Sequence, residues 1–178
     1  MAIPEHNLRL NLGCGRHVLD EWFNVDAKAS PLAPRAPELL SDVRKIDLPD
    51  GCATSIMAIH VWEHFYRWEC DDIIQEWRRL LRPRGTLIME MPDLFKFCQN
   101  ILDGRMKGGK DPDQLGMWGL YGDPRECDPL MVHRWGWAFA TLSPFLERHG
   151  FTDAKELTTK WHRAGRDHRD FRIEAVRT

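Results

Sequence analysis

Apolar residues recur along the chain in short runs, some alternating with polar residues and some continuously apolar. Runs of this kind predict strands. We expect strands at Leu8–Leu12, Trp22–Asp26, Glu38–Val43, Ser55–Val61, Thr86–Met91, Phe151–Thr159 and Arg169–Arg177. The run SIMAIHV at Ser55–Val61 has almost no polar positions, which is typical of a strand buried on both faces of a parallel sheet.

Helical spacing appears between several of these strands. The clearest helix is expected at Trp68–Leu81, where the apolar side chains fall on one stripe: Ile73, Ile74, Trp77, Leu80 and Leu81. A helix of only two turns is expected at Arg16–Glu21. Another is expected at Thr141–His149, with Gly150 just past its end.

Strands that alternate with helices predict an α/β fold with a Rossmann-like, doubly wound and mostly parallel sheet of seven strands. The last two strands are joined by about ten residues, which is short for a parallel crossover and favours an antiparallel C-terminal hairpin. Between residues 93 and 139 the periodicity fades. We therefore expect one domain over residues 1–178, with 93–139 inserted as a cap over the active site.

The composition and net charge narrow the possible domain number, partners and cellular compartment. The chain has 178 residues, 43% hydrophobic content and a formal net charge of −2, so one domain can bury a core without cross-links. Nothing in that charge indicates nucleic acid or an anionic membrane as a required partner. The five cysteines show no C-x-x-C spacing, which fits a reducing compartment. With no apolar leader and no apolar run of about 18 residues, we expect a cytoplasmic protein.

The strongest chemical signal follows the first strand. Leu8–Leu12 runs directly into Gly13-Cys14-Gly15, and glycine permits positive φ and close approach of a ligand to the main chain. The second strand ends in Asp26. An acid at that position can accept hydrogen bonds from ribose hydroxyls beyond the carboxyl ends of the strands. The sequence therefore predicts a cofactor that carries a nucleoside.

Further motifs follow in order. They are Asp42-Val43, Leu48-Pro49-Asp50, the run ending His60-Val61-Trp62-Glu63-His64-Phe65, and the helix end Leu80-Leu81-Arg82-Pro83-Arg84-Gly85. Together with the Gly-x-Gly turn, this succession resembles the class I S-adenosylmethionine-dependent methyltransferases of the small single-domain type. The resemblance covers Leu8–Met91 well and Thr141–Thr178 moderately, and it leaves out the insertion between them.

The resemblance implies S-adenosylmethionine as the cofactor and a methyltransferase activity of the EC 2.1.1 type. The residues that match the family's first motif, which wraps the methionine part of the cofactor, are Leu12, Gly13, Cys14 and Gly15. Asp26 matches the acid that holds the ribose hydroxyls. The interval from Gly15 to Asp26 is short, so the first helix must be curtailed.

Three more positions take expected roles from the same resemblance. Asp42 matches the acid near the adenine amino group, and Val43 would contact the ring through its backbone. His60 falls at the end of the fourth strand, beside the sulfonium end of the cofactor. Ser55 stands where the family usually has an Asp that opens this strand.

Methyl transfer from a sulfonium is an in-line displacement that needs binding, aiming and exclusion of water. No metal is required, and we expect no metal ligands. A hydroxyl acceptor would need a general base. His133 is the preferred catalytic candidate because it lies where the insertion rejoins the core, and His60 is the second; His64, Asp93 and Tyr121 are further candidates.

The insertion carries side chains that could meet an acceptor. Its aromatic residues could stack on a sugar ring or a planar molecule: Trp118, Tyr121, Trp135 and Trp137. Its basic residues could hold phosphate or carboxylate: Arg105, Lys107, Lys110, Arg125 and Arg134. By analogy with the family, we expect a small-molecule or sugar acceptor, with nucleic acid second, no membrane partner, and a monomer or weak homodimer.

Three other readings stay open at this stage. The fold could serve as a catalytically inactive binding module that keeps the glycines. His60-Val61-Trp62-Glu63-His64 matches the zinc-peptidase pattern H-x-x-E-H, although that chemistry needs a long helix and a third ligand. An NAD-binding module would need a third glycine near Val18, which is absent.

Overall fold

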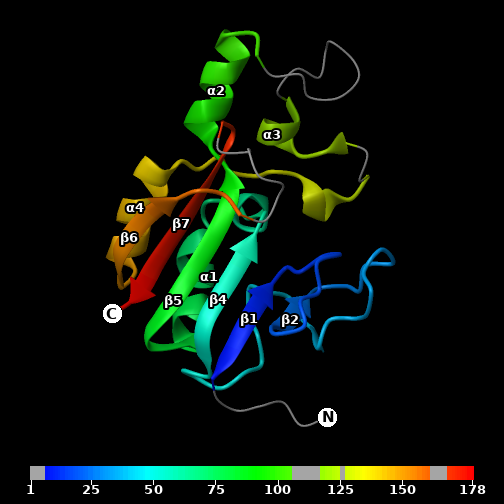
Figure 1. The fold of residues 1–178 in the computed structure, drawn as a ribbon, viewed down its shortest axis with the longest axis vertical. Helices are drawn as coiled ribbons and strands as arrows, with labels where there is room; N and C mark the ends of the chain where they lie inside the picture. Colours follow the sequence, from blue (N-terminus) through cyan, green and yellow to red (C-terminus); the bar gives the residue numbers. More distant parts are fainter. Residues whose placement is uncertain (1–6, 106–116, 125–126, 161–167) are drawn as a thin grey trace.

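A seven-stranded sheet forms the centre of the protein (Figure 1). The structure, a computed structural model, describes residues 7–105, 117–124, 127–160 and 168–178. The strands are β1 (Leu8–Leu12), β2 (Phe23–Asp26), β3 (Leu39–Leu40), β4 (Ala53–Ile59), β5 (Leu81–Pro92), β6 (Phe151–Leu157) and β7 (Asp170–Arg177). Their order across the sheet is β3-β2-β1-β4-β5-β7-β6.

The first five strands pair in parallel, and β7 runs antiparallel to both β5 and β6. The α/β fold class, with its mostly parallel sheet and antiparallel C-terminal strands, is therefore confirmed. Because β2, β1 and β4 are adjacent and parallel, their carboxyl ends meet at one edge of the sheet. This edge is where open α/β sheets bind their ligands.

Two helices and a short 3₁₀ turn pack together on one face of the sheet. They are α1 (Cys70–Leu80), α4 (Phe139–Arg148) and η1 (Trp62–His64). Trp62 is fully buried between them, with its ring centroid 5.1 Å from that of Trp77 in α1 and 6.1 Å from that of Phe145 in α4. Aromatic burial on this scale anchors η1, which directly follows the ligand-binding edge of β4.

The helix expected at Arg16–Glu21 is absent, and this segment forms turns. The buried side chain of Asn24 takes the place of helical hydrogen bonds there. Its Oδ1 accepts from the Leu19 N–H (2.9 Å), and its Nδ2 donates to the carbonyls of Leu19 (2.9 Å) and Trp22 (2.8 Å). Asn side chains compete with helices in this way. The connection is thus short but well bonded.

The segment between β5 and α4 contains structure that the sequence pattern did not predict. It includes α2 (Leu94–Leu102), α3 (Met117–Tyr121) and η4 (Pro129–Met131), and Figure 1 shows α2 and α3 beyond the arrowheads of β4 and β5. Asp93 caps α2 by accepting from the backbone N–H groups of Phe95 (2.9 Å) and Lys96 (3.1 Å). We call the described part of residues 93–139 the cap.

Two further findings bear on the sequence predictions. All five cysteines are free thiols, so no disulfide is formed. Across the described residues, none of the helices has the length and hydrophobicity needed to cross a bilayer.

Candidate active site

The turn after β1 has the backbone conformation that its glycines predict. Gly13 and Gly15 have φ values of +63° and +52°. The N–H groups of Gly13 and Cys14 both donate to the carbonyl of Val25 in β2, at 2.8 and 3.3 Å. The Gly15 N–H donates to Oδ2 of Asp26 at 2.7 Å. Three hydrogen bonds therefore hold the turn against β2.

The two glycines differ in what surrounds them. A Cβ atom on Gly13 would lie 2.6 Å from Cγ2 of Val61, whereas a Cβ atom on Gly15 would meet nothing within 4 Å. Gly13 is thus required by the packing of the protein itself, and the bare backbone open to a ligand is at Gly15. A small cavity of about 40 Å³ lies beside the turn and is lined by Asn11, Gly13, Cys14, His17, Leu19, Met57 and Ile59.

Leu12 and Cys14 are both buried, so a ligand could reach only their main chain. Burial, together with the nearby Asp26 carboxylate, raises the pKa of the Cys14 thiol to about 12. The thiol is therefore protonated at neutral pH and is no nucleophile.

Asp42 and Val43 follow β3, next to the end of β2, where the Ser41 N–H donates to the Asp26 carbonyl at 2.9 Å. The Asp42 side chain is half-exposed and pairs with Arg44, with its Oδ2 3.1 Å from Nη1. The Val43 carbonyl accepts a 2.9 Å hydrogen bond from Nε1 of the buried Trp77. Strand order thus brings Asp26, Asp42 and the glycine turn to one edge of the sheet.

His60 follows β4 in a left-handed conformation, with φ +53°. Its Nδ1 lies 3.0 Å from Oε1 of Glu63, and its Nε2 lies 3.6 Å from Oδ2 of Asp170. Burial alone would lower its pKa, but the carboxylates of Asp170 and Glu63 raise the pKa to about 9. His60 is therefore an imidazolium at neutral pH, held between two carboxylates.

The contacts with His60 also lower the pKa values of the Glu63 and Asp170 carboxylates. Burial would raise the pKa of Glu63, yet its hydrogen bond to His60 lowers the pKa to about 2. Asp170 also has a lowered pKa: burial opposes the shift, and the contact with His60 produces it. Asp170 was not among the sequence candidates, because nothing local to the start of β7 indicates that it meets His60.

His133 lies in the cap and faces the segment after β4. Its Nδ1 is 2.9 Å from the Gly119 carbonyl oxygen, and its Nε2 is 4.0 Å from Oε1 of Glu63. Burial lowers its pKa, so the imidazole is neutral at pH 7. The ring of His64 lies beside it, with the two centroids 5.0 Å apart. The structure thus brings His60, Glu63, His64 and His133 together.

The H-x-x-E-H reading needs two histidines on one face of a long helix. Here His60 precedes η1, which has only three residues. Both ring nitrogens of His60 face carboxylates, those of Glu63 and Asp170. His60 and His64 therefore do not form the histidine pair of a zinc peptidase.

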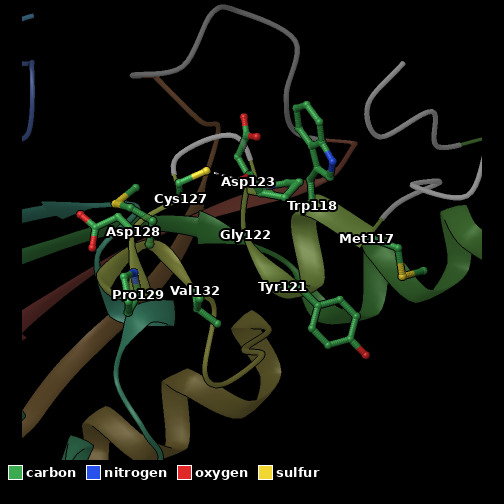
Figure 2. Close-up of a pocket in the computed structure, with 11 residues that line it drawn as sticks. Met117, Trp118, Tyr121, Gly122, Asp123, Cys127, Asp128, Pro129 and Val132 are labelled. Atoms are coloured by element: carbon green, nitrogen blue, oxygen red, sulfur yellow. Dashed lines mark hydrogen bonds between the residues drawn. The ribbon is translucent and has the colours of Figure 1, made fainter. Parts of the chain in front are cut away.

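A cavity of about 600 Å³ opens in the cap. Figure 2 shows α3 and the turn at Gly122 on one side of it and the segment 127–132 on the other. Of the aromatic candidates, Trp118 and Tyr121 line this cavity. The Tyr121 carbonyl accepts a hydrogen bond from the N–H of His133 at 3.2 Å, so the cavity wall adjoins the histidine cluster.

Other acceptor-binding candidates have different positions. Trp137 is 3% exposed and packs on Trp62 and Phe145, so it is a core residue and its expected stacking role is wrong. Arg134 donates to the carbonyls of His64 and Pro129, which ties the cap to η1. Trp135 is half-exposed, and Arg105 is exposed and pairs with Asp103. Lys107, Lys110 and Arg125 lie outside the described residues.

Comparison with known proteins agrees with this geometry. Residues 10–89 match the family model of a methyltransferase domain. An S-adenosylmethionine-dependent methyltransferase from Archaeoglobus fulgidus superposes with a TM-score of 0.64 at 15% identity, covering 98% of this chain and 87% of that one. One from Thermotoga maritima gives a TM-score of 0.62 at 14% identity, covering 99% and 84%.

A third similar structure was determined with S-adenosylhomocysteine bound. It is an N-methyltransferase from Haemonchus contortus, with a TM-score of 0.56 at 10% identity, covering 99% of this chain and 50% of that chain. Among curated protein sequences, none matches this chain.

The sheet order, the structural likeness and the match over residues 10–89 identify the class I S-adenosylmethionine-dependent methyltransferase fold. S-adenosylmethionine is the cofactor that the matched methyltransferase domain and this fold support. The resemblance read from the sequence and the expected cofactor are both confirmed. No acceptor is identified by these comparisons.

Proposed function

We propose that this protein transfers a methyl group from S-adenosylmethionine to a small-molecule or sugar acceptor that binds in the cap. The observation that carries the proposal is the open backbone at Gly15 joined to the Asp26 carboxylate, at the sheet edge below the cap. A small charged nucleoside could lie against this backbone and place its ribose on Asp26. In this proposal, Leu12, Gly13 and Cys14 contribute main-chain contacts.

The adenine half of the site is proposed at the end of β3. Asp42 keeps a half-exposed carboxylate there, which could accept from an adenine amino group. Val43 follows with its side chain buried, so its contribution would come from the backbone.

A chain of contacts connects the proposed cofactor site to the cap cavity. Val61 packs against Gly13, and Glu63 follows it in the same segment. The Glu63 carboxylate faces the His133 ring, and the backbone N–H of His133 donates to the carbonyl of Tyr121 in the cavity wall. An acceptor in this cavity would therefore lie close to the end of β4, where the sulfonium is expected.

In the transfer step, an acceptor atom attacks the methyl carbon while the C–S bond breaks and its electron pair stays on sulfur. The residues proposed here bind the two reactants, align them and exclude water, which can supply much of the rate enhancement. Neutral His133 can act on the acceptor through Nε2, whereas charged His60 cannot accept a proton. We therefore assign His60 to positioning, since it fixes Glu63 against Asp170.

We further propose that residues 1–178 form one methyltransferase domain with 93–139 as its cap. We place it in the cytoplasm, whose reducing environment would suit the five free thiols, as a monomer or weak homodimer.

A methyl-transfer assay tests the activity. The purified protein is incubated with S-adenosylmethionine labelled in the methyl group and with panels of sugars, hydroxylated small molecules, amines and RNA. Label in a sugar or small molecule, with release of S-adenosylhomocysteine, supports the proposal. Label transferred only to RNA overturns the acceptor class. Cofactor binding without turnover on any panel favours the inactive binding module instead.

A further inference from the structure

Glu63, His64 and His133 form a cluster whose purpose methyl transfer alone does not explain. We propose that these three residues hold a divalent transition-metal cation beside the cap cavity. This assigns a metal where the sequence predicted none. The role given to the ion below rests on the proposed methyltransferase function, whereas the binding site itself stands on its own geometry.

The donor atoms of the cluster already lie near one another. One carboxylate oxygen and two ring nitrogens, from Glu63, His64 and His133, fall within 4.8 Å of one another. Ligand atoms around a tetrahedral zinc ion are about 3.3 Å apart, so small side-chain rotations would close the site. Two imidazoles and one carboxylate suit first-row transition metals and leave coordination positions free for water or substrate.

Backbone carbonyls fix both histidines in the form that binds metal. Nδ1 of His64 lies 3.2 Å from the Val132 carbonyl oxygen, and Nδ1 of His133 lies 2.9 Å from that of Gly119. A carbonyl oxygen can only accept, so each Nδ1 carries the proton and each Nε2 keeps its lone pair. Metal-bound histidines are typically oriented by carbonyl or carboxylate partners of this kind.

Glu63 supplies an independent observation. Its side chain is 3% exposed, and Oε1 bonds to His60. Oε2 is buried and has no hydrogen-bond partner among the described residues. A buried carboxylate oxygen without a partner costs free energy unless a cation compensates it. A bound metal ion would satisfy this oxygen.

The cluster differs from the zinc-peptidase reading of the same motif. The third ligand comes from His133 in the cap, and His60 is excluded because its ring nitrogens face Glu63 and Asp170. The proposed site therefore joins η1 to the cap, next to the cavity.

A cation at this site would favour an acceptor that carries a hydroxyl group. An acceptor hydroxyl that binds the ion loses its proton to solvent more readily, because the metal lowers the hydroxyl pKa. The resulting oxyanion attacks the methyl carbon, the C–S bond breaks, and its electron pair remains on sulfur as a neutral thioether. In this account His133 is a ligand rather than the general base, and the acceptor atom is oxygen.

Cobalt titration tests the site without any need for an acceptor. The full-length protein is treated with chelator, then titrated with Co²⁺ while its visible d–d absorption is recorded. We expect saturable bands at one ion per chain that Zn²⁺ displaces. We expect His64→Asn and His133→Asn each to weaken Co²⁺ binding at least about tenfold. Absence of bands at about 1 mM Co²⁺ would overturn the proposal.

A matched control is available in α4. The His149 side chain is 13% exposed, as is that of His133, but it pairs with Asp71 away from the cluster. His149→Asn should bind Co²⁺ like the wild type, and circular dichroism checks that each variant is folded. Equal binding by the folded His64→Asn and His149→Asn variants would also contradict the proposed site.

Calorimetry with S-adenosylmethionine on the same chelator-treated protein separates the two proposals. If the protein binds the cofactor but no Co²⁺, the metal-site proposal is wrong and the proposed methyltransferase function still stands. If the protein binds Co²⁺ but not the cofactor, the proposed methyltransferase function is wrong and the metal-site proposal still stands.

Discussion

The backbone N–H of Gly15 donates a hydrogen bond to Oδ2 of Asp26, with the two atoms 2.7 Å apart. The other oxygen of this carboxylate accepts from the N–H of Lys28 at 3.2 Å. The groups expected to meet the methionine and ribose parts of the cofactor are therefore fixed to each other in the protein alone. Each carboxylate oxygen retains a second acceptor site, which a ribose hydroxyl can use.

The two glycines of the turn should respond differently to substitution by alanine. Both replacements place a side chain at positive φ, which costs about 1–2 kcal/mol. Gly13→Ala also drives its Cβ against Val61, at 2.6 Å, and should lose about a further 1–3 kcal/mol of unfolding free energy. Gly15→Ala should remain the more stable of the two but bind S-adenosylhomocysteine more weakly. Urea unfolding and calorimetry measure these two effects.

Val61 provides the control for this comparison. In a double-mutant cycle, Val61→Ala should recover part of the stability lost in Gly13→Ala, because it removes the contacting methyl groups. Strict additivity of the two changes would show that Val61 does not determine the need for glycine at position 13.

Asn24 should be among the polar residues that matter for stability. Asn24→Ala removes the hydrogen bonds to Leu19 and Trp22 and leaves the partly buried Leu19 N–H and Trp22 carbonyl without this partner. Each such group costs about 1–3 kcal/mol, so we expect a clear fall in melting temperature. Gln99→Ala, at an exposed position of α2 where the amide donates to Asp103 at 2.9 Å, is the control and should change little. Calorimetric melting that shows equal effects would contradict the role given to Asn24.

His60 should contribute to folding through its charge. His60→Ala leaves the buried carboxylates of Glu63 and Asp170 without the cation between them. Removal of one partner from a buried ionic group costs about 3–5 kcal/mol.

His149→Ala, which breaks a pair with the half-exposed Asp71, should cost far less than His60→Ala. Urea titration compares the two variants. Similar losses in both would argue that His60 is not held as an imidazolium.

Much of the fold could be predicted because its signals are local. Helix α1 follows from one apolar stripe, and β4 from a continuous apolar run. The helix expected at Arg16–Glu21 is absent because Asn24 satisfies the backbone of this segment from outside it. Helix α2 was not predicted, although Asp93 is a favourable N-cap residue and its side chain accepts from the backbone N–H groups of Phe95 and Lys96.

The candidate site was only partly visible in the sequence. The glycine turn and Asp26 lie within one strand-turn-strand unit, so their spacing indicated a site. The contacts of Glu63 with His133, and of His60 with Asp170, join segments that are distant in sequence. No local pattern encodes such contacts, and the same holds for Trp137, which the fold places in the core rather than the cavity.

Calorimetric titration with S-adenosylhomocysteine tests the central claim most directly, namely that the Gly15–Asp26 unit holds the cofactor. We predict saturable binding to the wild-type protein. Asp26→Ala should bind roughly tenfold to a hundredfold more weakly, because hydrogen bonds to a charged group contribute about 1.5–3 kcal/mol. Asp20→Ala, whose side chain is 98% exposed, should bind like the wild type. No heat at about 1 mM ligand, or unchanged affinity in Asp26→Ala, would contradict the account.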